Sequence, residues 1–190
     1  MEERRVTISR AKVAVDFPAS FMLIASMNPC PCGFYNHPDR ECTCPPGTVQ
    51  KYLNKISGPL LDRIDLHVEV TPVAFSELSA IKPQENSSSI RERVMTAREI
   101  QGERYKDNPG IYCNAQMSSK MLKEICVISQ VGANLLKAAM EKLNLSARAY
   151  DRILKVSRTI ADLAGSNDIK PEHLAEAIQY RSLDRDAYTQ

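Results

Sequence analysis

Two Cys-x-Cys pairs within fifteen residues constrain the fold of this chain more than any other feature. They come shortly after an apolar run at residues 21–25 and an Asn-Pro pair. An apolar run of this length is typical of a strand buried on both faces of a parallel sheet. In an open α/β sheet, the carboxyl ends of the strands form the edge at which ligands bind. We therefore expect Asn28 at a ligand-binding edge and the cysteines in the loop that follows it.

The composition is typical of a soluble globular protein. The 190 residues, 43% hydrophobic and 25% charged, suit a soluble globular protein of one or two domains. No apolar run approaches the ~20 residues that span a bilayer, and the charged N-terminus lacks the apolar core of a signal peptide. These features predict a cytoplasmic protein without membrane contact. Disulfides are rare in that compartment, and paired cysteines there are more often metal ligands or catalytic thiols.

The periodicity of apolar residues predicts an α/β piece followed by an all-α bundle. The first zone is expected to contain a hairpin at residues 6–17, a buried strand at 21–26, a short helix at 49–56 and a strand at 64–70. A linker at residues 72–89 contains two prolines and a serine run that can cap the next helix. Helices are predicted at residues 90–105, 121–125, 129–143, 147–164 and 172–180.

The predicted helices have clear start and stop signals. Ser118 or Ser119 is expected to cap the second helix, and Ser129 and Ser146 the next two. Gly165 follows the fourth helix at the position where a left-handed residue ends a helix. Along that helix, core-facing positions are expected at Ile153, Val156, Ile160 and Leu163.

Three blocks of sequence resemble one known family. They are Phe-Met-Leu-Ile-Ala-Ser-Met-Asn-Pro-Cys-Pro-Cys-Gly at residues 21–33, Gly-Pro-Leu-Leu-Asp-Arg-Ile-Asp-Leu at 58–66, and Leu-Ser-Ala-Arg-Ala-Tyr at 145–150. In this order they resemble the magnesium-chelatase-like AAA+ ATPases, in particular the ComM/YifB group. The resemblance implies that residues 1–71 are the C-terminal part of a P-loop AAA+ core, with a hairpin and two buried strands. It also implies that residues 90–190 are its helical lid.

The phosphate-binding loop of such an ATPase is missing from the sequence. The chain has seven glycines and no Gly-rich loop of the Walker type. The resemblance implies that the P-loop and Walker B segments precede these residues and that the natural chain begins upstream of Met1. We therefore expect residues 1–190 not to hydrolyse ATP by themselves.

The resemblance assigns nucleotide roles to three residues, and a fourth is a further candidate. Asn28 matches sensor 1, where a carboxamide positions the attacking water and the γ-phosphate. Arg63 matches the arginine finger, which reaches the nucleotide of a neighbouring subunit with a permanently charged guanidinium. Arg148 matches sensor 2 in the first turn of a helix, where the helix dipole also favours an anion. Arg152 lies one turn further on the same face and is a second candidate for nucleotide binding.

Each of these residues has a simpler alternative role. Asn28 precedes a proline and could be an ordinary turn residue. Arg63 has Asp62 and Asp65 as candidate ion-pair partners. Arg148 could be a surface arginine.

The cysteines predict a structural zinc site. Cys₄ is a common ligand set for tetrahedral Zn²⁺, although the pairs are closer in sequence than usual. The four ligands would be Cys30, Cys32, Cys42 and Cys44, and His37 lies between the pairs, where it could replace one of them. The alternative is four reduced thiols in an ordinary loop. Cys113 and Cys126 are interpreted as apolar filling.

The N-terminal hairpin is a candidate DNA contact. The resemblance places it at the pre-sensor-1 insertion, which in helicase relatives points into the ring channel. The candidate phosphate contacts are Arg4, Arg5, Arg10 and Lys12. The alternative is an edge strand protected by its charges.

The resemblance as a whole implies a ring-forming motor, with a hexamer as the expected ring, that uses ATP and Mg²⁺ to remodel DNA in branch migration. Two alternatives stay open. One is a chelatase-like motor that remodels a protein partner, and the other is a zinc-stabilised binding module without nucleotide chemistry.

Overall fold

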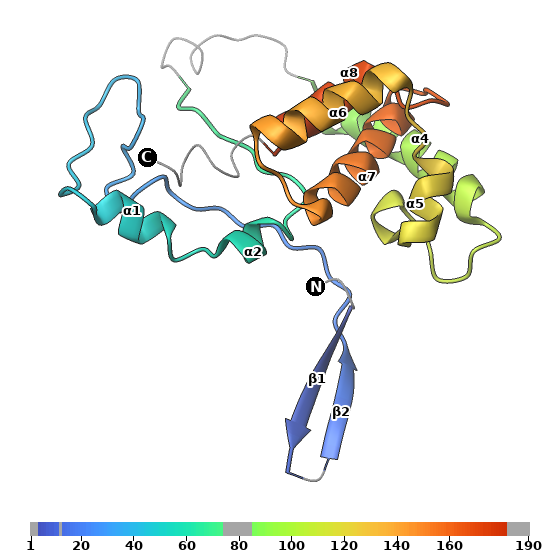
Figure 1. Cartoon of the computed structure of the whole chain (residues 1–190), viewed down its shortest axis with the longest axis horizontal. Helices are drawn as coiled ribbons and strands as arrows, with labels where there is room; N and C mark the ends of the chain where they lie inside the picture. The colour runs from blue at the N-terminus through green and yellow to red at the C-terminus, as the bar shows by residue number, and fades with distance from the viewer. Residues whose placement is uncertain (1–3, 12, 74–84, 182–190) are drawn as a thin grey trace. The chain divides into compact units, whose positions relative to one another are not determined.

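The computed structural model describes residues 4–11, 13–73 and 85–181 (Figure 1). Contacts within the chain divide it into two units, Met1–Arg63 and Ile64–Gln190. We predicted a boundary at residue 71 and a linker at 72–89; most of that linker lies outside the described residues, so this division stays a prediction. In the described part of the chain, no helix combines the length and hydropathy needed to cross a bilayer.

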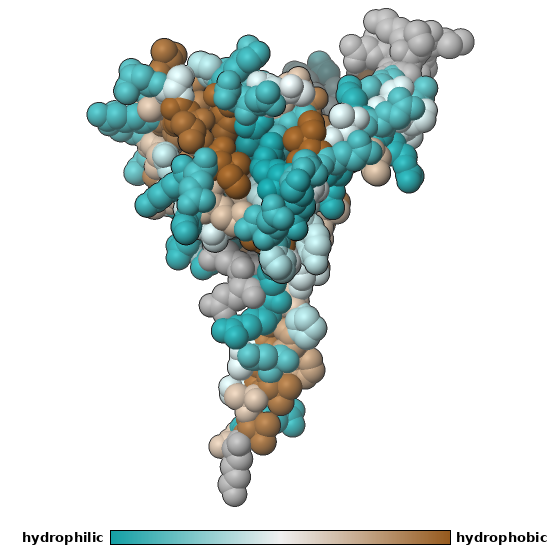
Figure 2. Space-filling view, turned by 90° about the vertical axis from the view of Figure 1, so that its right-hand side faces the viewer, coloured by the Kyte–Doolittle hydropathy of each residue, from teal (hydrophilic) through white to brown (hydrophobic). Residues whose placement is uncertain are grey.

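The first unit begins with the predicted hairpin. Strands β1 (Arg5–Arg10) and β2 (Val13–Pro18) are antiparallel and pair from Arg5 opposite Pro18 to Arg10 opposite Val13 (Figure 1). Side chains alternate between the two faces of such a ribbon. One face of the hairpin is apolar except for Arg10 beside the turn. Its apolar residues are all exposed: Val6, Ile8, Val13, Val15 and Phe17. Figure 2 shows these apolar side chains as brown atoms along the hairpin.

The two buried strands predicted at residues 21–26 and 64–70 are not present in the structure. Neither segment pairs with another strand, and Met22, Ile24 and Val70 are each more than 80% exposed. The physical reason is that a strand is held by hydrogen bonds to a neighbouring strand. Among the described residues, only β1 and β2 pair in this way. The predicted fold class is therefore confirmed for the hairpin and the helical bundle, but not for the buried strands.

Two short helices complete the first unit. Helix α1 (Thr48–Leu53) occupies the place of the helix predicted at 49–56, and its last residue, Leu53, is buried. Helix α2 (Gly58–Leu61) has a proline in its first turn, where the missing N–H is not needed. Arg63 lies two residues after the end of α2.

The second unit is a bundle of helices, as predicted. It contains α4 (Ser87–Tyr105), the 3₁₀ turn η1 (Asn114–Gln116), α5 (Ser119–Ile125), α6 (Gln130–Lys142), α7 (Ala147–Leu163) and α8 (Pro171–Gln179) (Figure 1). The predicted caps Ser118, Ser129 and Ser146 each accept a hydrogen bond from a backbone N–H in the first turn. At α4 the cap is Asn86, which accepts from the N–H of Ser89 at 2.8 Å, rather than the serine run itself.

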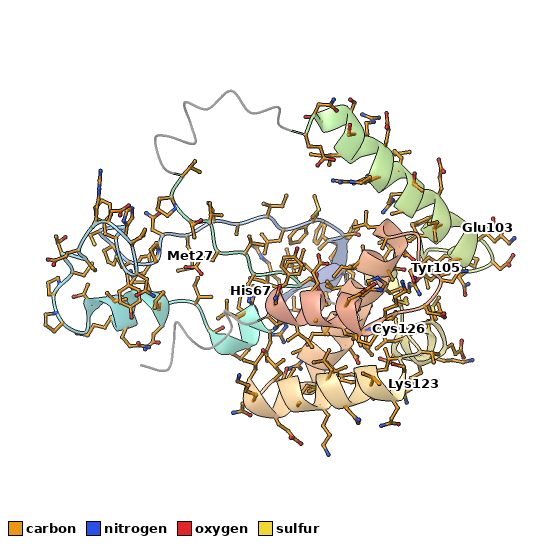
Figure 3. All side chains as sticks on the ribbon, turned by 90° about the horizontal axis from the view of Figure 1, so that it is seen from above. Met27, His67, Glu103, Tyr105, Lys123 and Cys126 are labelled. Atoms are coloured by element: carbon orange, nitrogen blue, oxygen red, sulfur yellow. The ribbon has the colours of Figure 1, made fainter. Side chains whose placement is uncertain are left out.

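The core of the second unit lies between α6, α7 and α8. Leu136, Ile153 and Leu174 are at most 1% exposed and contribute one side chain from each of these helices. Tyr105 and Cys126 belong to the same cluster and lie within the group of helices in Figure 3. Of the core positions predicted on α7, Ile153 is buried, and Val156 and Ile160 are partly buried against the core. Leu163 is 46% exposed, so the prediction is wrong at this position.

Two charged residues lie on the buried face of α7 near its end, where an apolar residue was predicted. Near the end of the helix the buried face consists of Arg158, Ala161 and Asp162 rather than Leu163. Arg158 and Asp162 form an ion pair at 3.1 Å with side chains that are 3% and 0% exposed. A hydrophobicity pattern cannot anticipate this arrangement, because a buried charge is tolerated only when its partner is also present.

Candidate functional site

A tight turn brings the first cysteine pair together. The N–H of Gly33 donates to the carbonyl of Cys30 at 3.0 Å, and Gly33 has a φ of +84°. Pro31 at the second position of this turn restricts the backbone to the φ that such turns need. The turn places the sulfur atoms of Cys30 and Cys32 at 3.3 Å from each other.

The second pair meets the first across the loop. The sulfur of Cys42 lies 3.7 Å from that of Cys30 and 3.5 Å from that of Cys32. All four sulfur atoms, including that of Cys44, are within 4.8 Å of one another. Zn–S bonds of about 2.3 Å in a tetrahedron separate the sulfurs by about 3.8 Å. The cluster is therefore compatible with a structural Zn²⁺ site that uses all four thiolates.

The electrostatics of the cluster favour a cation. A backbone hydrogen bond from Phe34 is the largest influence on Cys32 and, with smaller contributions from neighbouring groups, lowers the pKa of its thiol to about 5. A backbone hydrogen bond from Cys32 lowers the pKa of Cys44, but burial and the other three cysteines outweigh it and raise this pKa to about 12. Cys32 thus ionises readily, whereas the pKa values of Cys42 and Cys44 are raised, because adjacent thiolates repel each other. A bound divalent cation removes that repulsion.

The other cysteines and His37 lie outside this cluster. His37 accepts a hydrogen bond at Nδ1 from the N–H of Asp39 at 3.1 Å and packs edge-on against Phe34. Cys126 is buried in the helical core, and burial raises the pKa of its thiol to about 11. This confirms the interpretation of Cys126 as apolar filling.

The predicted nucleotide residues fall in both units. Asn28 is exposed just before the cysteine loop. Arg63 is half-buried and its Nη1 donates to the carbonyl of Pro59 at 2.7 Å, which satisfies the end of α2. Arg148 is exposed in the first turn of α7, beside the cap formed by Ser146. Their assembly into one nucleotide site stays a prediction.

Arg152 forms an ion pair with a carboxylate that we had considered as a partner of a different arginine. Its Nη1 forms an ion pair with Oδ1 of Asp65, a residue that was considered as a partner for Arg63. The Arg152 side chain is 16% exposed. The pair joins residues 87 positions apart, and no local signal in the sequence connects them.

The hairpin does not gather its positive charges on one face. Arg5 forms an ion pair with Asp16 at 3.5 Å on the polar face, whereas Arg10 lies at the end of the apolar face and is exposed. Arg4 precedes β1 and is half-buried. Lys12, the fourth candidate for DNA binding, lies outside the described residues.

Comparison with known families matches both parts of the chain. The family described as magnesium chelatase, subunit ChlI, matches residues 1–78. The family described as magnesium chelatase, subunit ChlI C-terminal, matches residues 84–181. The two matches together cover almost every residue that the structure describes.

Individual relatives are similar along nearly the whole chain. Competence protein ComM of Haemophilus influenzae is 43% identical over 186 residues, which are 97% of this chain and 35% of the relative. The uncharacterised protein YifB of Escherichia coli is 39% identical over 186 residues, with the same two coverages. The chain thus spans about a third of the length of the curated relatives that it matches.

Proposed function

The chain belongs to the family of magnesium chelatase subunit ChlI, and from this membership we propose that it is part of a ring-forming AAA+ ATPase of the ComM/YifB group. Such a protein couples the hydrolysis of ATP with Mg²⁺ to the remodelling of DNA. The observation that carries the proposal is the agreement of two family matches, in order, with the three blocks that contain Asn28, Arg63 and Arg148.

The proposed nucleotide chemistry is positioning and charge stabilisation. Asn28 orients the attacking water, Arg148 contacts the phosphates from its own protomer, and Arg63 reaches the nucleotide of the neighbouring protomer. Phosphoryl transfer spreads negative charge over the γ-phosphate oxygens, and a guanidinium placed there stabilises it. The exposed position of Arg148 at a helix N-terminus supports its role, because both the side chain and the helix dipole favour an anion.

The exposed apolar residues of the first unit support the proposal that residues 21–26 form a strand of a larger sheet. Met22 and Ile24 are each 82% exposed, although residues of this kind are normally covered. In the proposed AAA+ core, residues 21–26 are a strand buried in a parallel sheet and need neighbouring strands on that sheet. We propose that the remainder of the full-length protein supplies these neighbours and buries residues 21–26.

The cysteine cluster is proposed to hold one structural Zn²⁺. Cys30, Cys32, Cys42 and Cys44 would be its ligands. When bound, the ion neutralises the thiolates and holds the two ends of the loop together. With all four coordination positions filled by protein, it has no open position for catalysis.

The hairpin supports a second candidate function. Its apolar face, with Val15 and Phe17 44% and 48% exposed, suits contact with a protein rather than with phosphates. This observation favours a chelatase-like motor that remodels a protein partner. The arginines at the ends of the hairpin favour DNA.

The experiment that tests the proposed function measures ATP turnover by the full-length protein and by its Arg63→Ala variant. The variant should lose about 10³-fold or more in turnover while its nucleotide affinity stays close to the original value. Arg98→Ala, which removes an exposed arginine of α4, is the matched control and should change neither. Equal turnover by the Arg63→Ala variant would rule out the finger role, and an unaltered protein without turnover would rule out the ATPase.

A further inference from the structure

Three contacts attach the segment after Arg63 to the helical unit. Asp65 forms its ion pair with Arg152 of α7. The carbonyl of Ile64 accepts a hydrogen bond from Nη1 of Arg181, just beyond α8. The N–H of His67 donates to the carbonyl of Tyr180 at 2.9 Å, and Figure 3 shows His67 beside the end of this part of the bundle. The contacts cover residues 64–67 and therefore hold the backbone directly after Arg63.

The burial of the two arginines makes this attachment specific. The residue Arg181 is 1% exposed, and the Arg152 side chain is 16% exposed. A guanidinium removed from water to this extent loses much of its hydration, so it needs an anion or a carbonyl in a fixed place. Asp65, whose side chain is 53% exposed, supplies that anion to Arg152. Movement of residues 64–67 away from α7 and α8 would therefore leave these guanidiniums buried without their partners, which is costly.

The same helix presents the proposed nucleotide contact. Arg148 and Arg152 are four residues apart on α7 and therefore lie one turn apart on one face. The rise of about 1.5 Å per residue makes this turn about 6 Å long. Arg148 is exposed, whereas Arg152 points its charge at Asp65. The two arginines on this face of α7 therefore have different roles: Arg152 binds Asp65, and Arg148 is the proposed phosphate contact.

From this arrangement we infer that Arg152 is a positioning residue for Arg63, acting through Asp65, and not itself a nucleotide contact. The inference rests on the proposed function. A phosphate held by Arg148 biases the position of α7, and α7 holds Asp65, two residues after Arg63. The occupancy of one protomer's own nucleotide site is thereby coupled to the finger that this protomer offers to its neighbour.

The test uses the full-length protein and the variants Asp65→Asn, Arg152→Ala and their combination. Each single variant should lower kcat about fivefold or more, the usual lower range for coupling between sites. KM should stay within about twofold, because a residue that acts only on the finger does not bind the ground-state nucleotide. The double variant should be no slower than the slower single variant, because both changes remove one interaction. Asp65→Glu, which keeps the carboxylate, should recover turnover.

A second readout does not depend on ATP turnover. Hydrogen exchange at the His67 amide should become faster in Asp65→Asn and in Arg152→Ala, because these changes release the segment that this amide anchors. Glu141→Gln is the matched control: it breaks an exposed pair with Lys137 on α6 and should leave both exchange and turnover unchanged. Thermal unfolding of every variant shows whether the helical unit is still folded.

The outcomes separate the two claims. An unaltered protein that turns over ATP, with Asp65→Asn and Arg152→Ala variants that match it in kcat, would overturn the inference alone. A tenfold rise in KM with kcat unchanged would instead indicate that Arg152 contacts the nucleotide. That result would also overturn the inference. Absence of turnover in the unaltered protein would count against the proposed function, while faster exchange at His67 would still support the attachment of residues 64–67.

Discussion

The carboxylate of Asp162 on α7 accepts two hydrogen bonds from the guanidinium of Arg104 on α4, 58 positions earlier in the chain. Nη1 of Arg104 lies 2.7 Å from Oδ2, and Nη2 lies 2.5 Å from Oδ1. Arg158 donates from Nε to the same Oδ1 at 3.1 Å. Asn114 completes the group by donating to Oδ2 at 2.8 Å. The fully buried carboxylate of Asp162 therefore joins α4, η1 and α7 and is the anionic partner of two arginines.

The substitution Asp162→Asn should destabilise the helical unit more than any surface change. The asparagine side chain is similar in shape but neutral, so Arg104 and Arg158 would be left without a countercharge in a buried place. Removing one partner of a buried ion pair costs about 3–5 kcal/mol, and we expect a loss of that size in the free energy of unfolding. Urea denaturation followed by circular dichroism measures it. Glu141→Gln, at an exposed pair, should change stability by less than about 0.5 kcal/mol; similar values for both variants would contradict the central role of Asp162.

Tyr105 should make the stability of the helical unit depend on alkaline pH. Burial raises the pKa of this phenol from 10.0 to about 12, with Arg104 opposing the shift. The folded state thus holds the proton more tightly than the unfolded state. The protonated phenol of Tyr105 makes its full contribution to stability below pH 10, and this contribution is lost as the pH rises from 10 to 12. Unfolding free energies measured across this range should fall more steeply for the original protein than for Tyr105→Phe. Parallel curves would show that Tyr105 is not buried in this way.

Gly132 allows α6 to approach α8 closely, so Gly132→Ala should destabilise the bundle. An added Cβ would lie 2.7 Å from Cδ1 of Leu174, a fully buried side chain that would have to shift against its neighbours. Overpacking costs about 1–3 kcal/mol, which exceeds the gain of about 1 kcal/mol from replacing a helical glycine. Gly102→Ala is the control, because nothing lies within 4 Å of its new Cβ. Thermal unfolding should therefore move to lower temperature for the first variant and to higher temperature for the second.

The cysteine cluster should contain one zinc ion per chain in protein purified without chelators. Elemental analysis measures this directly. Cys42→Ser should remove most of the metal, because it takes away the sulfur that lies close to both Cys30 and Cys32. Cys113→Ser, which changes a cysteine outside the cluster, should keep the zinc content unchanged. A metal-free original protein, or equal zinc in both variants, would contradict the Cys₄ site.

The hairpin should contribute phosphate contacts if the motor acts on DNA. Arg10→Ala in the full-length protein should weaken binding of a fluorescent DNA duplex. It should also lower the slope of log affinity against log salt concentration by about 0.9, the value for one lost contact. Lys137→Ala, an exposed lysine on α6, is the control for net charge and should leave this slope unchanged. If Arg10→Ala keeps both affinity and slope while Phe17→Ser abolishes capture of a protein partner, the hairpin belongs to a protein-remodelling motor.

The helices could be predicted closely because their ends depend on local contacts. Ser118, Ser129 and Ser146 each bond to an N–H three residues further along the chain. Gly165, with a φ of +64°, ends α7 where it was expected. All of these interactions lie within one helical turn, so the spacing of residue types is enough to reveal them. The proximity of the four cysteines also followed from their spacing, which is fifteen residues in total.

The strands could not be predicted in the same way. An apolar run such as residues 21–26 indicates that a segment prefers to be buried, but not whether a neighbouring strand is there to bury it. In this structure it is exposed. On α7, the pattern of apolar residues pointed to Leu163, while the buried position belongs to Asp162.

The sequence alone was enough to predict the hairpin, the cysteine cluster, the family and most helix limits closely, because each depends on residues close together in the chain or on blocks of matching sequence. Which charges meet depends on the tertiary structure. The pair of Asp65 with Arg152 joins residues 87 positions apart, and that of Arg104 with Asp162 joins residues 58 positions apart. Packing of the helices brings such charges together, and a buried charge is stable only where an opposite charge or a hydrogen-bond partner lies within reach. That partner is fixed by the three-dimensional arrangement and not by spacing along the chain.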